Sequence, residues 1–325
     1  IISVEKEGQR MRIVFMGTPD FAVPCLKLLI DQQHDIAAVV TQPDRAKGRG
    51  KKLALPPVKV LAEEAGIPVY QPERIKAPEF VQVLRDLKPE VMIVVAFGQL
   101  LSREILDIPP LGCINVHASL LPKYRGAAPI NWCIINGEHT TGVTTMYMDK
   151  GMDTGDMILK KETDILENET AGELHDRLMP LGAAVLEETM VLLELGRVPR
   201  TPQNESEATY APIMTKSLGR IDWSRDVKAI NNLIRGTYPW PGAFSTYEGR
   251  AFKIFKAEAI ENVSGNKSCG CISRVSKDSI IVSCGTGSLR ITELQFENEK
   301  RMDVEAYLRG HEIAVGVILG DGPIY

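Results

Sequence analysis

Three features are scarce in this sequence of 325 residues: aromatic side chains, cysteines and long apolar runs. Aromatic residues make up 6% of the chain, whereas 44% is hydrophobic and 25% charged, which is typical of a globular rather than a disordered or fibrous protein. No apolar run approaches the roughly 18 residues that a membrane-spanning helix needs. The first residues also lack the basic, apolar and small-residue pattern of a signal peptide. We therefore expect a cytoplasmic protein that does not enter a membrane.

The cysteines form neither a disulfide framework nor a metal-binding pattern. They are Cys25, Cys113, Cys133, Cys269, Cys271 and Cys284. None belongs to a Cys-x-x-Cys pair, and none clusters with histidine in the spacing of a structural zinc site. We expect reduced thiols and no metal.

The sequence also has no excess of positive charge, because its 38 basic and 42 acidic side chains give a net charge of −4. That total argues against a protein coated in positive charge for binding nucleic acid, but it does not exclude a local basic patch. One such patch is a run of five cations in eight residues: Arg45, Lys47, Arg49, Lys51 and Lys52. It is either a solvated loop or a loop that grips phosphates.

Strand and helix patterns alternate along the first part of the chain. Apolar runs predict strands at 12–16, 36–41, 69–71, 91–96, 113–116, 141–148 and 157–163. Helical patterns lie at 21–30, 55–65, 80–87, 130–136 and 171–195. This alternation predicts an α/β domain at 11–198 with a Rossmann-like, mostly parallel sheet. The turn after the first strand lacks Gly-x-Gly-x-x-Gly, which argues against a nicotinamide-dependent enzyme.

The pattern changes after residue 198. Residues 199–212 are polar and rich in proline, as in a linker. Residues 213–325 then combine a helix at 227–235 with short strands at 243–247, 252–257, 270–275, 279–284 and 289–296. These strands predict a second, small domain with an OB-like β-barrel. We interpret residues 1–10 as an extension ahead of the first domain.

The strongest candidates for chemistry follow two strands of the predicted sheet. Asn115 and His117 are two residues apart on a strand, so their side chains share one face. The turn after the strand at 141–148 carries Asp149, Asp153 and Asp156. A carboxylate beside His117 would orient its imidazole and favour the cationic form. From spacing alone, an ordinary acidic turn is an equal alternative.

Five stretches of the sequence are informative as motifs: MRIVFMGTPDFAVPCL, TQPDRAKGRGKKL, AFGQLL, INVHASLLPKYRGAAPINW and MDKGMDTGDMI. Together with Tyr238–Ala243, they closely resemble the methionyl-tRNA formyltransferases, within the wider family of folate-dependent formyltransferases. The resemblance runs from about Met11 to the C-terminus. It implies formyl transfer from 10-formyltetrahydrofolate, the co-substrate, to the α-amino group of methionine on initiator tRNA, without a metal.

The resemblance also implies which residues do this work. Asn115, His117 and Asp153 would be the catalytic trio. The folate would be held by Phe97, Gly98, Gln99, Leu100, Leu101, Ser119, Leu120, Leu121, Pro122, Asp149, Lys150, Gly151 and Met152. The basic run, Arg45, Lys47, Arg49, Lys51 and Lys52, would grip the acceptor stem of the tRNA. The second domain would help to bind that tRNA, and we expect a monomer.

Two alternatives remain open at this point. One is a related enzyme that formylates a small amine, such as a nucleotide-linked sugar or glycinamide ribonucleotide. The other is an RNA-binding protein whose catalytic domain is inactive. The basic run and the second domain argue against the first alternative, and the complete trio argues against the second.

Overall fold

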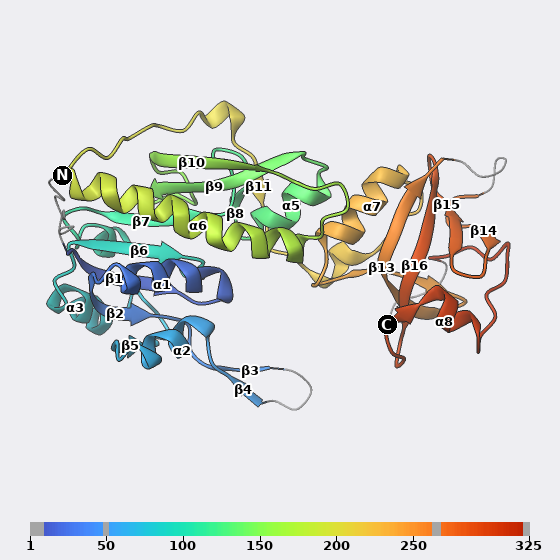
Figure 1. Cartoon of the computed structure of the whole chain (residues 1–325), viewed down its shortest axis with the longest axis horizontal. Helices are drawn as coiled ribbons and strands as arrows, with labels where there is room; N and C mark the ends of the chain where they lie inside the picture. Colours follow the sequence, from blue (N-terminus) through green and yellow to red (C-terminus); the bar gives the residue numbers. More distant parts are fainter. Residues whose placement is uncertain (1–9, 48–51, 262–267, 321–325) are drawn as a thin grey trace, which may run out of the picture. The chain divides into compact units, whose positions relative to one another are not determined.

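The structure is a computed structural model that describes residues 10–47, 52–261 and 268–320. The chain divides into two compact units (Figure 1). The first contains the chain up to Gly126, Thr141–Asp164 and His175–Tyr210; the second contains Ala127–Thr140, Ile165–Leu174 and the chain from Ala211. The domain limits expected from the sequence, 11–198 and 213–325, stay a prediction.

The first unit is built around one sheet with helices. Its strands, with two short hairpin strands, are β1 (Arg12–Gly17), β2 (Asp35–Val40), β3 (Arg45–Lys47), β4 (Lys52–Ala54), β5 (Val69–Tyr70), β6 (Val91–Val95), β7 (Cys113–His117), β9 (Thr140–Tyr147) and β10 (Met157–Asp164). Its helices are α1 (Val23–Asp31), α2 (Pro57–Glu64), α3 (Pro78–Asp86), α4 (Arg103–Leu106) and α6 (Ala171–Glu194). A short pair, β8 (Arg125–Gly126) with β11 (Tyr210–Ala211), lies outside the main sheet.

The main sheet is Rossmann-like, as the sequence predicted. Its strand order is β10-β9-β7-β6-β1-β2-β5, and β5, β2, β1, β6 and β7 pair in parallel while β9 runs antiparallel to β7 (Figure 1). The chain moves outward from β1 through β2 and returns on the other side through β6. Ligands of such sheets bind beyond the carboxyl ends of the strands, where this order reverses. Thr18 and Phe97 follow those ends, and Thr18 Oγ1 donates to the Phe97 carbonyl at 3.1 Å.

Apolar patterning explains why these segments fold as they do. Every residue of β6 is buried, which matches a continuous apolar strand covered on both faces. The α3 helix begins with Pro78 in its first turn and buries Phe80, Val81 and Leu84 on one side. Those side chains join Met92 and Val94 of β6 in one hydrophobic cluster. This packing fixes the strands whose ends carry the candidate site.

The second unit contains the expected small antiparallel β-structure. Its elements are α5 (Pro129–Ile135), α7 (Val227–Gly236), β12 (Ala243–Tyr247), β13 (Arg250–Ile260), β14 (Ile272–Val275), β15 (Ile280–Ser283), β16 (Ser288–Phe296), β17 (Met302–Asp303) and α8 (Val304–Leu308). The strand order is β12-β13-β16-β15-β14, with β17 added to β16. The pairings between these strands run antiparallel. The predicted OB-like barrel domain is thereby confirmed, whereas α8 and β17 were not predicted.

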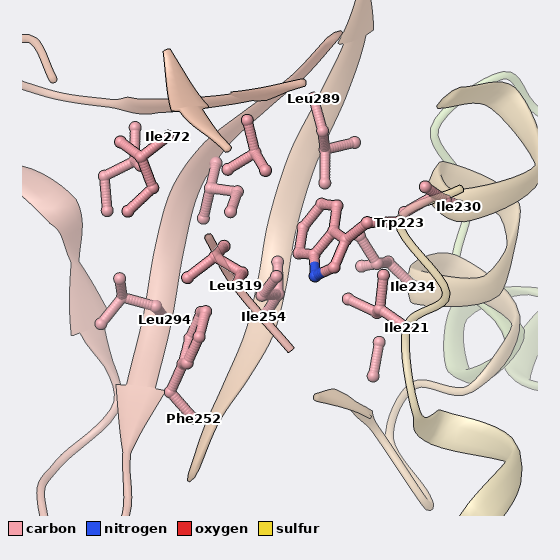
Figure 2. Close-up of a cluster of buried hydrophobic side chains, with 14 of the residues drawn as sticks. Ile221, Trp223, Ile230, Ile234, Phe252, Ile254, Ile272, Leu289, Leu294 and Leu319 are labelled. Carbon is pink, nitrogen blue, oxygen red and sulfur yellow. The ribbon is translucent and has the colours of Figure 1, made fainter. Parts of the chain in front are cut away.

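Trp223 is central to the core of this unit. Its side chain is 5% exposed and packs with the apolar face of α7, which buries Val227, Ile230 and Ile234 (Figure 2). Its indole N–H donates to Ser245 Oγ at 2.9 Å, so the one polar atom of the ring is satisfied inside the core. Helix and sheet therefore share one hydrophobic core. In the part of the chain that the structure describes, none of the helices has both the length and the apolar composition of a membrane span.

Candidate active site

Asn115 and His117 lie on β7, between β9 and β6 of the main sheet. The whole strand is buried, and the two side chains are 9% and 6% exposed. Register with the neighbouring strands pairs Asn115 with Val94 of β6 and His117 with Thr144 of β9. Val116 points to the opposite face, where Gly182 of α6 lies close to it. One face of β7 is therefore used for packing and the other presents the two polar side chains.

Asp153 completes the group from a distant part of the sequence. Its Oδ1 accepts from Asn115 Nδ2 at 3.4 Å, and its Oδ2 lies 3.7 Å from Nδ1 of His117. The Gly126 backbone N–H donates to Oδ2 at 2.8 Å. The carboxylate thus lies over the face of β7 that carries Asn115 and His117. The structure brings together all three residues that the resemblance had picked out.

The proton positions on His117 follow from its partners. Nε2 lies 3.0 Å from the Tyr124 carbonyl oxygen, which can only accept a hydrogen bond. Nε2 therefore carries a hydrogen and donates it to Tyr124. Nδ1, which faces Asp153, is the nitrogen that can exchange a proton with a substrate.

The loop that carries Asp153 has an unusual backbone. The turn contains two glycines, Gly151 and Gly155, but the residue in the left-handed region is Asp153 itself, with φ of 54°. For a non-glycine residue this conformation costs about 1–3 kcal/mol. Gly155 is needed for another reason, because a Cβ atom there would lie 1.8 Å from the Tyr147 carbonyl oxygen. Asp149 Oδ1 closes the turn by accepting from Gly151 N and Thr154 Oγ1 at 2.9 and 2.6 Å.

The turn after β7 is fixed by a threonine that the sequence analysis did not single out. Thr144 Oγ1 donates to the Ser119 carbonyl at 2.6 Å and accepts from Leu121 N at 3.2 Å. Ser119 Oγ donates to the Lys123 carbonyl at 2.7 Å. Because Thr144 is also the register partner of His117, the same position on β9 holds the turn and adjoins the histidine.

A buried arginine, Arg125, also contributes to the site, and no sequence pattern had predicted its role. Arg125 is 0% exposed, and its guanidinium donates to Gln203 Oε1 at 3.0 and 2.9 Å and to both Glu205 oxygens at 2.9 and 2.7 Å. The hydrogen bond and charge of Arg125 hold the pKa of Glu205 below its ordinary value. Gln203 and Glu205 belong to the segment 199–212, which the proline and polar pattern had indicated as a linker. Here it supplies side chains to the neighbourhood of Asp153.

Comparison with known protein families accounts for both units. The model described as "Formyl transferase" matches residues 11–190, and "Formyl transferase, C-terminal domain" matches residues 213–312. The chain belongs to the formyl transferase family. The family resemblance drawn from the sequence motifs is thereby confirmed.

Full-length relatives of this formyl transferase bear closely related sequences. A protein of Acetivibrio thermocellus named methionyl-tRNA formyltransferase is 53% identical over 310 residues, which are 95% of this chain and 100% of the relative. The protein of that name from Clostridioides difficile is 57% identical over 310 residues, with the same coverage. Among solved structures, WlaRD, a sugar 3N-formyl transferase, has a TM-score of 0.67 at 19% identity, covering 90% of this chain and 100% of that one. At that identity the likeness shows the fold alone.

The expected folate loop of this formyl transferase follows β6. Ala96 and Gly98 have φ of 46° and 88°, so the chain turns sharply on either side of Phe97. Gln42 Nε2 donates to the Phe97 carbonyl at 3.1 Å, and Gln99 Oε1 accepts from Ile75 N at 2.9 Å.

The expected folate residues differ widely in exposure. Phe97, Leu101 and Leu121 are 2%, 8% and 0% exposed, so their side chains serve mainly to pack the loops. Leu100 and Met152 are 59% and 51% exposed and can reach a ligand. Their roles toward folate stay a prediction.

The basic run falls partly within the described residues. Arg45–Lys47 and Lys52–Ala54 pair as the antiparallel hairpin β3–β4, where the sequence had predicted a loop. Arg49 and Lys51 lie outside the described residues. At the base of the hairpin, Asp44 accepts from Lys59 Nζ at 2.8 Å, and this hydrogen bond lowers the pKa of Asp44.

Two cysteines of the second unit, Cys269 and Cys271, are separated by one residue and differ in exposure. Cys271 is buried, whereas Cys269 is exposed. Within the part of the chain that the structure describes, no three histidine, cysteine, aspartate or glutamate side chains gather in the arrangement of a metal site.

Proposed function

We propose that the chain transfers the formyl group of 10-formyltetrahydrofolate to the α-amino group of methionine on initiator tRNA, for the initiation of translation. The observation that carries this proposal is the 53–57% identity to relatives named methionyl-tRNA formyltransferase, over the whole length of those relatives. The grouping of Asn115, His117 and Asp153 supports it, because these side chains suit the chemistry of formyl transfer.

The reaction sets the requirements for the site. The amine nitrogen attacks the formyl carbon, and the carbonyl electrons move to the formyl oxygen, which becomes negative. The attacking nitrogen then loses a proton, and the folate nitrogen gains one as its bond to carbon breaks. The products are a formylated amine and tetrahydrofolate, so one proton moves between two nitrogens and no net charge is created.

Asn115 is placed to stabilise the negative oxygen. Its side-chain amide has two hydrogens, and one of them points to Asp153 Oδ1. The second can be donated to the formyl oxygen as negative charge develops there. Loss of one such donor slows acyl transfer by about 10²–10³-fold in comparable sites.

His117 is placed to move the proton. Because Nε2 is bound to the Tyr124 carbonyl, Nδ1 takes the proton from the attacking amine and passes it to the leaving nitrogen. An imidazole suits both halves of this transfer near neutral pH. Asp153 balances the charge that His117 gains and keeps Nδ1 directed toward the reacting atoms.

The co-substrate is proposed to be a folate that lies over the carboxyl ends of β1 and β6. WlaRD, a sugar formyl transferase with the same fold, was solved in the presence of 5-N-formyl-THF, which supports a folate donor here. Leu100 and Met152 present apolar side chains suited to an aromatic ring. The proposed folate contacts also include the 119–122 turn. The same proposal places the acceptor stem of the tRNA against the β3–β4 hairpin and its basic residues. The proposal further takes the protein to be a cytoplasmic monomer, in which one chain supplies all members of the trio.

An acceptor comparison tests this function. Transfer from labelled 10-formyltetrahydrofolate is measured with methionyl initiator tRNA, glycinamide ribonucleotide and a nucleotide-linked amino sugar. We expect rapid formylation of the tRNA and negligible formylation of the small amines. Preference for a small amine would establish the first alternative. Tight tRNA binding without turnover, in the presence of the donor, would establish an inactive RNA-binding protein.

A further inference from the structure

Gln203 joins two parts of the site that are far apart in the sequence. Its Nε2 donates to the carbonyl oxygens of Asp153 and Gly155, each at 2.8 Å. Its Oε1 accepts from the guanidinium of Arg125 at 3.0 and 2.9 Å. One half-buried amide therefore holds the loop of Asp153 on one side and a buried arginine on the other.

The orientation of this amide is dictated by its partners. A guanidinium carries only donors, so the atom of Gln203 that faces Arg125 is the oxygen. The carbonyls of Asp153 and Gly155 only accept, so the atom facing them is the nitrogen. Only this orientation of the Gln203 amide pairs each donor with an acceptor, both toward Arg125 and toward the Asp153 loop.

Arg125 gives the amide a rigid anchor. Its guanidinium is wholly buried and is shared between Gln203 and the carboxylate of Glu205. Its backbone N–H also donates to the Thr209 carbonyl at 2.9 Å. The guanidinium has little freedom to move, because a movement that breaks any of these contacts would leave a buried charge without its partner.

These contacts close a ring around Asp153. Gly126, the neighbour of Arg125, donates its N–H to the Asp153 carboxylate, and Gln203 binds the Asp153 carbonyl. The two ends of the aspartate are therefore both tied to residues 125 and 126. Asp153 needs such support because its left-handed backbone is unfavourable for a residue with a Cβ atom.

We propose that Gln203 is a positioning residue for Asp153, acting through the two carbonyl hydrogen bonds rather than by touching the substrate. The inference rests on the proposed function, since it assigns Gln203 to the aspartate of the formyl-transfer site. Displacement of a catalytic group by about 1 Å can slow a reaction by about 10²-fold. Loss of the amide donor should therefore lower the turnover number more than it lowers substrate binding.

Gln203→Glu separates the two halves of the contact. The variant keeps an oxygen for Arg125 but places a second oxygen against the carbonyls of Asp153 and Gly155. We expect kcat to fall at least about tenfold, KM for methionyl-tRNA to stay within about twofold, and the melting temperature to remain near that of the wild type. Gln203→Asn, which keeps the amide on a shorter stem, should recover part of the lost rate.

Asn204→Ala is the matched control. Asn204 lies on the same segment, is exposed, and accepts from Ser206 N instead of contacting the Asp153 loop. It should retain wild-type kcat. A Gln203→Glu enzyme with normal kcat would overturn the proposal, and so would an equal loss of kcat in Asn204→Ala.

A measurement independent of catalysis separates this inference from the proposed function. The Gly126 amide reports the position of the Asp153 carboxylate, because that carboxylate is its hydrogen-bond acceptor. Hydrogen exchange of this amide should be at least about tenfold faster in Gln203→Glu than in wild type or Asn204→Ala. Unchanged exchange would reject the positioning role even in an active enzyme. Faster exchange in Gln203→Glu, together with a wild-type chain that does not formylate methionyl-tRNA, would support positioning and reject the function.

Discussion

The Gly126 backbone N–H donates to the Asp153 carboxylate at 2.8 Å across 27 residues of sequence. This bond fixes one carboxylate oxygen, and the same oxygen lies 3.7 Å from Nδ1 of His117. A backbone donor cannot change rotamer, so the carboxylate is placed before any substrate arrives. Prearranged groups of this kind need little reorganisation as charge develops, which is the main advantage of such a site.

Removal of the Asn115 or the His117 side chain tests the catalytic roles proposed for these two residues. Asn115→Ala removes the proposed donor to the formyl oxygen, and His117→Ala removes the group that moves the proton. Each should slow formyl transfer to methionyl-tRNA at least about 100-fold. Single-turnover rates at saturating donor and tRNA measure the effect, with circular dichroism to show an intact fold. A variant that keeps a near-normal rate does not belong to the catalytic group.

Arg49→Ala tests the role of the basic run in tRNA binding. The arginine should supply salt-sensitive affinity for phosphate, so the substitution should raise KM for methionyl-tRNA at physiological salt. The effect should shrink as salt is added, because ions compete for the same phosphates. Arg85→Ala is the control, since Arg85 is an exposed arginine on α3 that pairs with Glu104 and does not belong to the basic run. Equal kinetics for Arg49→Ala and wild type would remove Arg49 from the proposed binding surface.

The pair of Arg125 and Glu205 predicts a pH-dependent contribution to stability. Arg125 lowers the pKa of Glu205 below the ordinary 4.5, so the carboxylate binds fewer protons when folded than when unfolded. The stabilisation is complete above that ordinary value and is lost as the pH falls through the lower folded-state pKa. Glu205→Gln should therefore reduce the free energy of unfolding at neutral pH, with the difference from wild type shrinking in acid.

Urea unfolding at several pH values measures that difference. Glu207→Gln is the control, because Glu207 is exposed and accepts from Asn204 instead of an arginine. It should leave the free energy of unfolding nearly unchanged. A loss in Glu205→Gln that is the same at every pH would show that the ion pair is not its source.

Thiol reactivity tests whether β7 is closed to solvent. Burial raises the pKa values of Cys25, Cys113 and Cys284 to about 12, which keeps these thiols protonated and unreactive at mildly alkaline pH. Cys269 is exposed and should be alkylated by iodoacetamide in the native protein. Peptide mass analysis identifies the modified residue. Rapid labelling of Cys113, at the start of β7, would show that the strand opens and that the site is not prearranged.

The elements with a regular apolar pattern could be predicted from the sequence. Continuous apolar runs such as Val91–Val95 and the helical pattern of α7 have local signatures, and both elements formed where expected. Asn115 and His117 share a face because side chains alternate along any strand. The carboxylate that meets them could not be chosen from spacing alone, since three aspartates lie in the same turn. The family resemblance selected Asp153.

The hydrogen bonds that join Arg125, Gln203 and the Asp153 loop could not be predicted in the same way. Arg125 and Gln203 are 78 residues apart, and hydrogen bonds at that separation leave no local pattern. Prolines and polar residues made 199–212 look like a linker because the same composition serves both an exposed segment and one held by side-chain hydrogen bonds. The left-handed conformation of Asp153 was also unforeseen, because glycines nearby offered the more ordinary explanation for a tight turn.

The most direct test of the account is single-turnover transfer of a labelled formyl group from 10-formyltetrahydrofolate to methionyl initiator tRNA by wild type, Asp153→Ala, and His117→Ala/Asp153→Ala. The wild type should formylate the tRNA, and Asp153→Ala should be at least about 100-fold slower. The double variant should be little slower than the worse single variant, because residues that act as a unit are not additive. A wild type that leaves the tRNA unformylated, or an Asp153→Ala variant with a near-normal rate, would contradict the account.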